Sequence, residues 1–162
     1  MSPKDMIKKT LDMSDFIFKS YVGDLSDAEL KIVPIEGMNP IALQIGHLIS
    51  AERMFAEMVN PGSSPPLPAG FDEAHSLKNR EGDDSRFLGK DEYMKLYEAQ
   101  RAALKAVIDS VPDADLTDTR GGKLPEFAPT VADALNMAGI HSLMHAGQYV
   151  AVRRMLKKPV TI

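Results

Sequence analysis

Residues 139–148, with the sequence GIHSLMHAGQ, place polar side chains where an amphipathic helix normally carries apolar ones. His141 and His145 are four residues apart, and Gln148 follows three residues later. In an α-helix this spacing puts the three side chains on one face. The same spacing continues in apolar residues on both sides of the stretch: Ala134, Ala138, Val152 and Met155. We therefore expect a long helix whose buried face is polar at its centre.

Capping signals set the bounds of this helix. Thr130 and Asp133 match a capping box, so the helix is expected to begin after Thr130. It should end near Lys157, shortly before Pro159.

The segment from Asn39 to Asn60 predicts a second helix of the same kind. Asn39 is a favourable N-cap, Pro40 is a favourable first residue, and the Pro-Gly pair after Asn60 should stop the helix there. One face of this helix carries the following residues: Gln44, His47, Ala51, Met54, Phe55 and Met58. The second helix therefore also carries an imidazole where Leu or Ile would be typical.

Two further helices and two long connections complete the pattern. Apolar residues at helical spacing predict helices over about 3–21, with Ser2 as its cap, and over about 91–111. The connection over 61–89 is rich in Pro, Gly, Ser and acidic residues, with one short turn expected near 71–77, and a second connection covers 112–129. Connections of this length inside a domain are often functional. We see no internal repeat and no coherent strand pattern. We predict an all-α fold, a four-helix bundle that forms a single domain over residues 1–162.

Composition excludes several kinds of site and partner. The chain carries 23 acidic and 19 basic side chains, a net charge of −4, so we expect no nucleic-acid partner. No apolar run approaches the roughly 20 residues that span a bilayer, and the N-terminus lacks the apolar core of a secretory signal. We expect a soluble, cytoplasmic protein that does not bind a membrane. Because the chain has no Cys, a metal would have to be held by His, Asp or Glu.

Three histidines on two buried helix faces favour a metal site. A single buried His is usually satisfied by hydrogen bonds, and a metal-free core remains one interpretation of the three. Burying three unpartnered imidazoles would cost on the order of 1–3 kcal/mol each, which a divalent metal held by His47, His141 and His145 would offset. Such a site would leave coordination positions open and suits Zn, Ni or Fe. Residue 142 is Ser where zinc peptidases carry a Glu base, so we discount peptidase activity.

Other polar residues near these helices are candidates for supporting roles. Gln44 and Gln148 are expected to contact a substrate or to support the ligand histidines, and no catalytic residue is assigned. His75, in the first long connection, is expected to be exposed, with a fourth-ligand or acid–base role as the alternative. Glu52 is expected to pair with an Arg rather than act as a general base. The methionines are expected to fill the core: Met54, Met58, Met137, Met144 and Met155.

Two segments resemble the DinB-like family of four-helix proteins, which includes thiol-dependent transferases. One is NPIALQIGHLISAERMF at residues 39–55, and the other is HSLMHAGQYVAVRRMLKKP at residues 141–159. The order of the helices and the long connection between the second and third also agree. The segment before His47 lacks the aromatic residue of many relatives, and the LKKP ending replaces their Leu-Gly. These departures bear on the subgroup and substrate, not on the ligand positions.

The resemblance implies an up-down-down-up bundle, a homodimer, and a divalent metal on His47, His141 and His145, with Gln148 at the family's Gly-Gln position. It makes a small-molecule substrate with a low-molecular-weight thiol as co-substrate plausible. We therefore expect a metal-dependent thiol S-transferase or detoxification enzyme, with a metal-dependent hydrolase as a related possibility. The alternative is a non-catalytic, stress-related protein that binds a metal or ligand.

Overall fold

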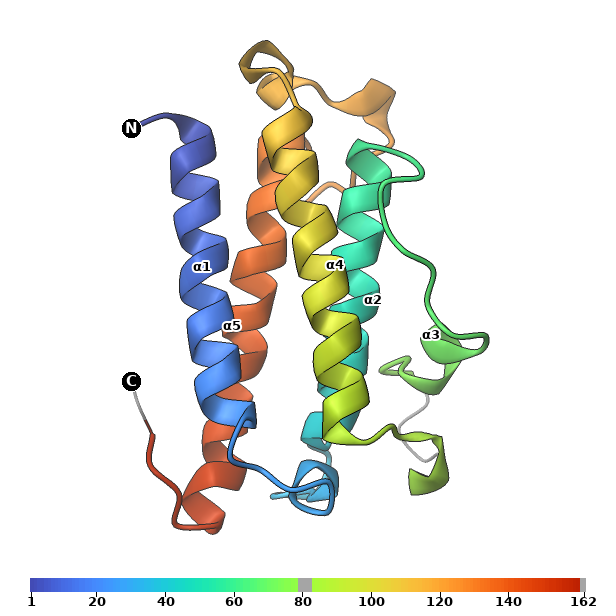
Figure 1. Cartoon of the computed structure of the whole chain (residues 1–162), viewed down its shortest axis with the longest axis vertical. Coiled ribbons are helices and arrows are strands. Elements are labelled where there is room, and N and C mark those ends of the chain that lie inside the picture. Colours follow the sequence, from blue (N-terminus) through green and yellow to red (C-terminus); the bar gives the residue numbers. More distant parts are fainter. Residues whose placement is uncertain (79–82, 161–162) are drawn as a thin grey trace.

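The computed structural model describes residues 1–78 and 83–160 of the chain. Four long helices form its body: α1 (Pro3–Val22), α2 (Ile41–Val59), α4 (Lys90–Ser110) and α5 (Val131–Met155). Helices α1 and α5 run in one direction and α2 and α4 in the other, which is the up-down-down-up order (Figure 1). The described residues contain no strand. The prediction of an all-α four-helix bundle is confirmed.

Both long connections are present. Because α2 and α4 run in the same direction, the chain must return along the bundle before α4 can begin (Figure 1). This connection contains α3 (Phe71–Ala74), inside the predicted turn, and a 3-10 helix at Asp84–Arg86. Residues 79–82 of the predicted connection, like residues 161–162 of the predicted domain, lie outside the described residues. The α4–α5 connection contains 3-10 helices at Asp113–Thr117 and Arg120–Gly122, and another, at Glu29–Lys31, lies between α1 and α2.

Side-chain caps fix the starts of α1 and α5 as predicted. The Ser2 hydroxyl accepts a hydrogen bond from the Asp5 backbone N–H at 3.2 Å, and the Ser2 backbone N–H donates back to the Asp5 carboxylate. Thr130 and Asp133 form the same reciprocal pair at the start of α5. Each box satisfies backbone donors that the first turn of a helix leaves free.

The start of α2 differs from the prediction. Pro40 has a ψ of 153°, so it is the N-cap and the helix begins at Ile41; Asn39 does not cap it. A side chain from the next turn holds the Asn39 backbone instead: the Gln44 amide nitrogen donates to the Asn39 carbonyl at 2.8 Å. This bond accompanies an extended backbone at Pro40. The remaining long-helix ends lie within about two residues of their predicted positions, the usual scatter of such boundaries.

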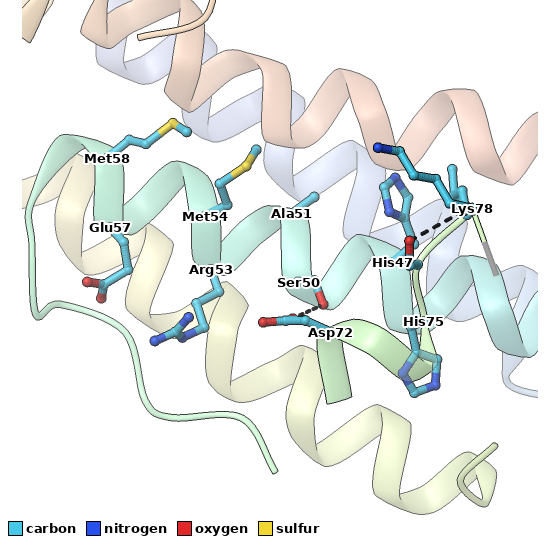
Figure 2. Close-up of a pocket in the computed structure, with 12 residues that line it drawn as sticks. His47, Ser50, Ala51, Arg53, Met54, Glu57, Met58, Asp72, His75 and Lys78 are labelled. Carbon is cyan, nitrogen blue, oxygen red and sulfur yellow. Dashed lines mark hydrogen bonds between the residues drawn. The ribbon is translucent and has the colours of Figure 1, made fainter. Parts of the chain in front are cut away.

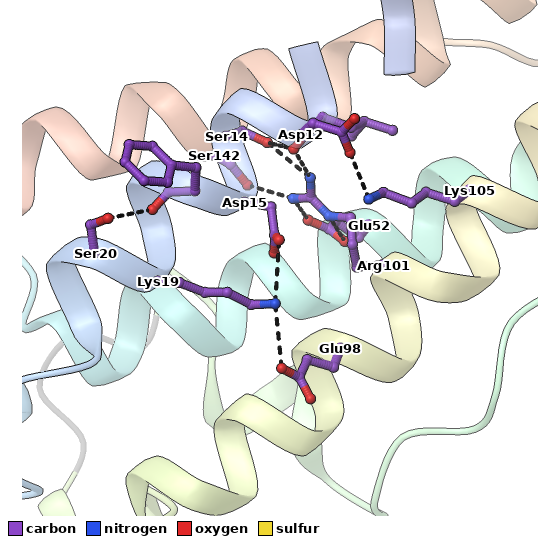
Figure 3. A network of polar contacts seen from close by, with 12 residues as sticks. Asp12, Ser14, Asp15, Lys19, Ser20, Glu52, Glu98, Arg101, Lys105 and Ser142 are labelled. Carbon is purple, nitrogen blue, oxygen red and sulfur yellow. Dashed lines mark hydrogen bonds and ion pairs between the residues drawn. The ribbon is translucent and has the colours of Figure 1, made fainter. Parts of the chain in front are cut away.

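A buried polar layer separates two apolar clusters in the bundle core. At its centre Arg101 of α4 forms a two-pronged pair with Glu52 of α2 (Figure 3). Its Nη1 donates to the Leu11 carbonyl at 2.9 Å and to Ser14 at 2.8 Å, and its Nη2 also donates to Ser142 at 3.3 Å. All five guanidinium donors therefore have acceptors. Burial disfavours the charge on Arg101, but the Glu52 carboxylate, together with the nearby Tyr97 and Asp15, outweighs this and raises the pKa of Arg101. The predicted pairing of Glu52 with an Arg is confirmed.

None of the helices in the described part of the chain combines the length and apolar character that a membrane span requires.

Candidate metal centre

The structure brings His47 of α2 together with His141 and His145 of α5. One ring nitrogen from each lies within 4.8 Å of the others. The ring centroids are 4.7 Å apart for His141 and His145, and 5.0 and 5.4 Å apart for the two pairs that include His47. Among the described residues, no carboxylate and no further histidine joins this cluster. Three converging imidazoles without a sulfur ligand suit a divalent metal ion of intermediate softness, such as Zn, Ni or Fe.

Gln44 determines which ring nitrogen of His145 faces the cluster. The Gln44 amide nitrogen is occupied by the Asn39 carbonyl, so its oxygen must be the atom that lies 2.8 Å from Nδ1 of His145. Nδ1 must then carry the proton that is donated to this oxygen, because an amide oxygen only accepts. The unprotonated Nε2 of neutral His145 therefore points at Nε2 of His141, 3.1 Å away. This tautomer presents a lone pair to a metal.

Burial keeps the three imidazoles neutral at pH 7. His145 is only 6% exposed, and burial together with the neighbouring His141 and His47 lowers its pKa to about 3. Burial and the proximity of His47 lower the pKa of His141 to about 4, and burial also lowers that of His47. Removal from water disfavours the charged ring, and like charges repel each other. Because metal ligation requires the neutral ring, the cluster is in its binding form at neutral pH.

A cavity with charged walls lies along α2, between this helix and the α2–α4 connection. It has a volume of about 720 Å³, and His47 borders it together with Arg53, Asp72 and Lys78 (Figure 2). The Ser50 hydroxyl donates to the Asp72 carboxylate at 2.5 Å, which ties α3 to α2 beside the cavity. The cavity thus offers groups of both charges near His47.

A second cavity, of about 430 Å³, lies between α2 and α5. His47 and His141 border it, and the rest of its wall is apolar: Ala51, Met54, Phe55, Phe127, Met137 and Met144. None of the described residues that line it is an Asp, Glu, Lys or Arg. The two cavities share His47, Ala51 and Met54, so they adjoin at the histidine cluster.

The family model of the DinB superfamily matches residues 17–149, a span that contains all three histidines. The chain belongs to the DinB superfamily. A crystal structure of a conserved protein from Enterococcus faecalis is similar to this DinB-superfamily chain, with 19% sequence identity and a TM-score of 0.71. The match covers 95% of this chain and 96% of that one, and at this identity it concerns the fold. No curated protein sequence matches the chain.

Gln148 does not lie where the sequence predicts in this DinB-superfamily protein. It is exposed, and the fully buried Tyr149 occupies the next core position of α5 after His145. Around the helix axis, positions 148 and 149 lie about −60° and +40° from His145. Helical spacing therefore allows either side chain to share the buried face with His145. The large Tyr ring gains more from burial than a carboxamide does, which decides between them. Gln148 therefore cannot support the histidines from the core.

The expectation that His75 is exposed is wrong. His75 is 2% exposed, its Nδ1–H donates to the Phe71 carbonyl at 2.8 Å, and its Nε2 accepts from the Tyr93 hydroxyl at 2.7 Å. A Cβ added to Gly46 would lie 2.0 Å from Cδ2 of His75, so the ring packs directly on α2, beside His47. With both nitrogens engaged, His75 anchors α3 and is not a fourth ligand. No pattern in the sequence indicates the contact with Tyr93, 18 residues away.

The expectation that the methionines fill the core of this DinB-superfamily protein is also partly wrong. Met54, Met144 and Met155 are 39%, 62% and 57% exposed, respectively. Met54 and Met144 line the apolar cavity, whereas Met58 and Met137 pack against the core as expected, Met137 also bordering the cavity. Their spacing matches that of a core stripe, and only the position of the cavity distinguishes the two roles.

Proposed function

We propose that His47, His141 and His145 hold one divalent metal ion, Zn, Ni or Fe, and that the protein is a metal-dependent enzyme of the thiol S-transferase or detoxification type. The observation that carries this proposal is the convergence of three neutral imidazoles beside two cavities, with no fourth side-chain ligand among the described residues. Three protein ligands with open positions are typical of catalytic metal sites, whereas structural sites are closed by four. The resemblance to thiol-dependent transferases supplies the reaction class.

Residues around the histidines would support the metal and position the co-substrate. Gln44 keeps the proton on Nδ1 of His145, so that Nε2 stays free to ligate. Arg53 and Lys78 line the charged cavity and can orient the polar groups of a thiol co-substrate near His47. The chemistry that a divalent metal supplies in such a site is a lowered pKa of a bound thiol or water.

The proposed reaction joins a low-molecular-weight thiol to an electrophilic carbon. The S–H bond breaks and its proton passes to solvent. The sulfur electron pair forms a new S–C bond, while the leaving group departs with the electron pair of its bond to carbon. No electron acceptor is required. The reactants are a thiol and an alkyl or aryl electrophile, and the products are a thioether, the leaving-group anion and a proton.

Metal analysis combined with turnover tests this proposal. Purified wild-type protein should contain about one metal per chain and should conjugate a thiol with an electrophile such as 1-chloro-2,4-dinitrobenzene. His47→Ala and His145→Ala should lose both metal and turnover, while Gln148→Ala should keep both because Gln148 is exposed. Turnover that persists in metal-free protein would contradict the mechanism.

Two other outcomes identify the alternatives. A protein that binds metal but turns over none of the thiol and electrophile pairs offered would support the non-catalytic, stress-related binding protein. A metal-free protein whose melting temperature does not rise with added Zn or Ni would support purely structural histidines. We also propose a homodimer, on the family resemblance, and sedimentation equilibrium tests it.

A further inference from the structure

We propose that the apolar cavity between α2 and α5 binds an uncharged, apolar group of the electrophilic substrate and accepts such groups in differing shapes. The role of this group as part of a substrate rests on the proposed function. The binding itself requires only the cavity.

The walls of the cavity select for an apolar ligand. Its volume of about 430 Å³ falls within the range of roughly 300–1,000 Å³ that is usual for small-molecule sites. Apart from the two histidines, every described residue that lines it is apolar. A charged group placed against this wall would lose part of its hydration and find no charged side chain among the described lining residues, whereas an apolar group would release water from the walls.

The position of the cavity places such a ligand beside the histidine cluster. His47 and His141 form part of its wall, while His145 and Gln44 do not line it. The charged cavity shares His47, Ala51 and Met54 with it and is also lined by Arg53, Asp72 and Lys78. A polar co-substrate in the charged cavity and an apolar group in the apolar cavity would therefore both lie next to the histidines.

The side chains at the cavity suit ligands of varied shape. Met54, Met137 and Met144 are unbranched and polarizable, so they can repack around different groups. Phe127 and Met144 are 63% and 62% exposed although they belong to this apolar wall. They come from separate elements, since Phe127 lies in the α4–α5 connection and Met144 on α5. A bound apolar group would cover part of both.

Fluorescence titration with N-phenyl-1-naphthylamine, an uncharged apolar probe, tests the proposal on the full chain in the presence of EDTA. We expect saturable binding of about one probe per chain, with displacement by the linear alcohol 1-octanol. Met144→Lys should weaken probe binding about tenfold, because a charge now borders the site, and Phe127→Ala should weaken it several-fold. Matched controls are Met13→Lys and Phe16→Ala, whose side chains are 53% and 56% exposed on α1 and line neither cavity.

The outcomes separate this proposal from the proposed function. His145→Ala should lose metal yet bind the probe with unchanged affinity, since His145 does not line the cavity. Probe binding by a wild type that takes up no Zn, Ni or Fe when each is supplied without EDTA would support the cavity and contradict the metal centre. Equal binding by wild type, Met144→Lys and Phe127→Ala would overturn the cavity proposal. So would a wild-type dimer that binds no probe and becomes monomeric in both variants, because a second chain would then cover this face.

Discussion

The side-chain oxygen of Gln44 lies 2.8 Å from Nδ1 of His145, and its amide nitrogen is held by the Asn39 carbonyl at the same distance. This chain of two hydrogen bonds connects the start of α2 to the most buried of the three histidines. It fixes both the ring orientation and the tautomer of His145.

Replacing Gln44 should therefore weaken metal binding without removing a ligand. We expect Gln44→Leu to lower the affinity about 10–100-fold, the usual effect of removing a residue that orients a metal ligand. Competition with a chromophoric chelator measures it. Gln148→Leu is the matched control because Gln148 is exposed. Equal affinities of the two variants would show that Gln44 does not orient His145.

Removing one member of the Glu52–Arg101 pair should lower the free energy of unfolding strongly, whereas replacing both members with apolar residues should lower it little. We expect Glu52→Leu to lower the free energy of unfolding by about 3–5 kcal/mol, because it leaves a buried guanidinium without its counter-charge. The double variant Glu52→Leu with Arg101→Met should regain most of this loss. Urea denaturation measures both. Purely additive losses in the double variant would contradict the proposed coupling.

His75 and Tyr93 should stabilise the α2–α4 connection without affecting metal content. Tyr93→Phe removes the hydroxyl that donates to Nε2 of His75, which should cost about 1–3 kcal/mol in unfolding free energy. Metal stoichiometry should stay at the wild-type value, since neither residue belongs to the cluster. Loss of metal in a folded Tyr93→Phe protein would contradict the separation of the His75–Tyr93 contact from the metal centre.

The metal-free protein should lose stability as the pH falls below about 6.5. Burial lowers the pKa of His141 to about 4 and that of His145 to about 3 in the folded chain, whereas unfolded histidines keep ordinary values near 6.5. Between these values the unfolded chain binds more protons, so acidification favours unfolding. Urea titrations at pH 7 and pH 5 with EDTA present should show the decrease. His145→Gln should reduce the difference, and an unchanged difference would contradict the neutral, buried state of His145.

The sequence predicts the helices and the His141–His145 pair because both depend on local signals, whereas the approach of His47 is a tertiary contact. Thr130 with Asp133 and Ser2 at the chain start are short-range caps, and their helices begin as expected. Histidines four residues apart on α5 must share a face. The up-down-down-up order followed from the family resemblance and not from local patterns.

The errors arise where tertiary contacts choose between locally equivalent options. Spacing could not decide between Gln148 and Tyr149, and burial of the ring decided it. His75 lies in a polar connection, and its burial depends on Tyr93 and on the open space at Gly46. The start of α2 moved because Gln44 bonds to the Asn39 carbonyl. None of these contacts can be inferred from helical periodicity.

X-ray absorption at the metal edge of the purified protein is the sharpest test of the three-histidine metal centre, because it reports both the element and its ligands. We expect one Zn, Ni or Fe per chain with three imidazole nitrogens, at roughly 2.0–2.1 Å if the metal is Zn, and one or more further light atoms. His47→Ala should lose the metal, and with it the imidazole signal. A spectrum that is unchanged in His47→Ala, or wild-type protein that binds no metal at stoichiometric concentration, would contradict the three-histidine metal centre.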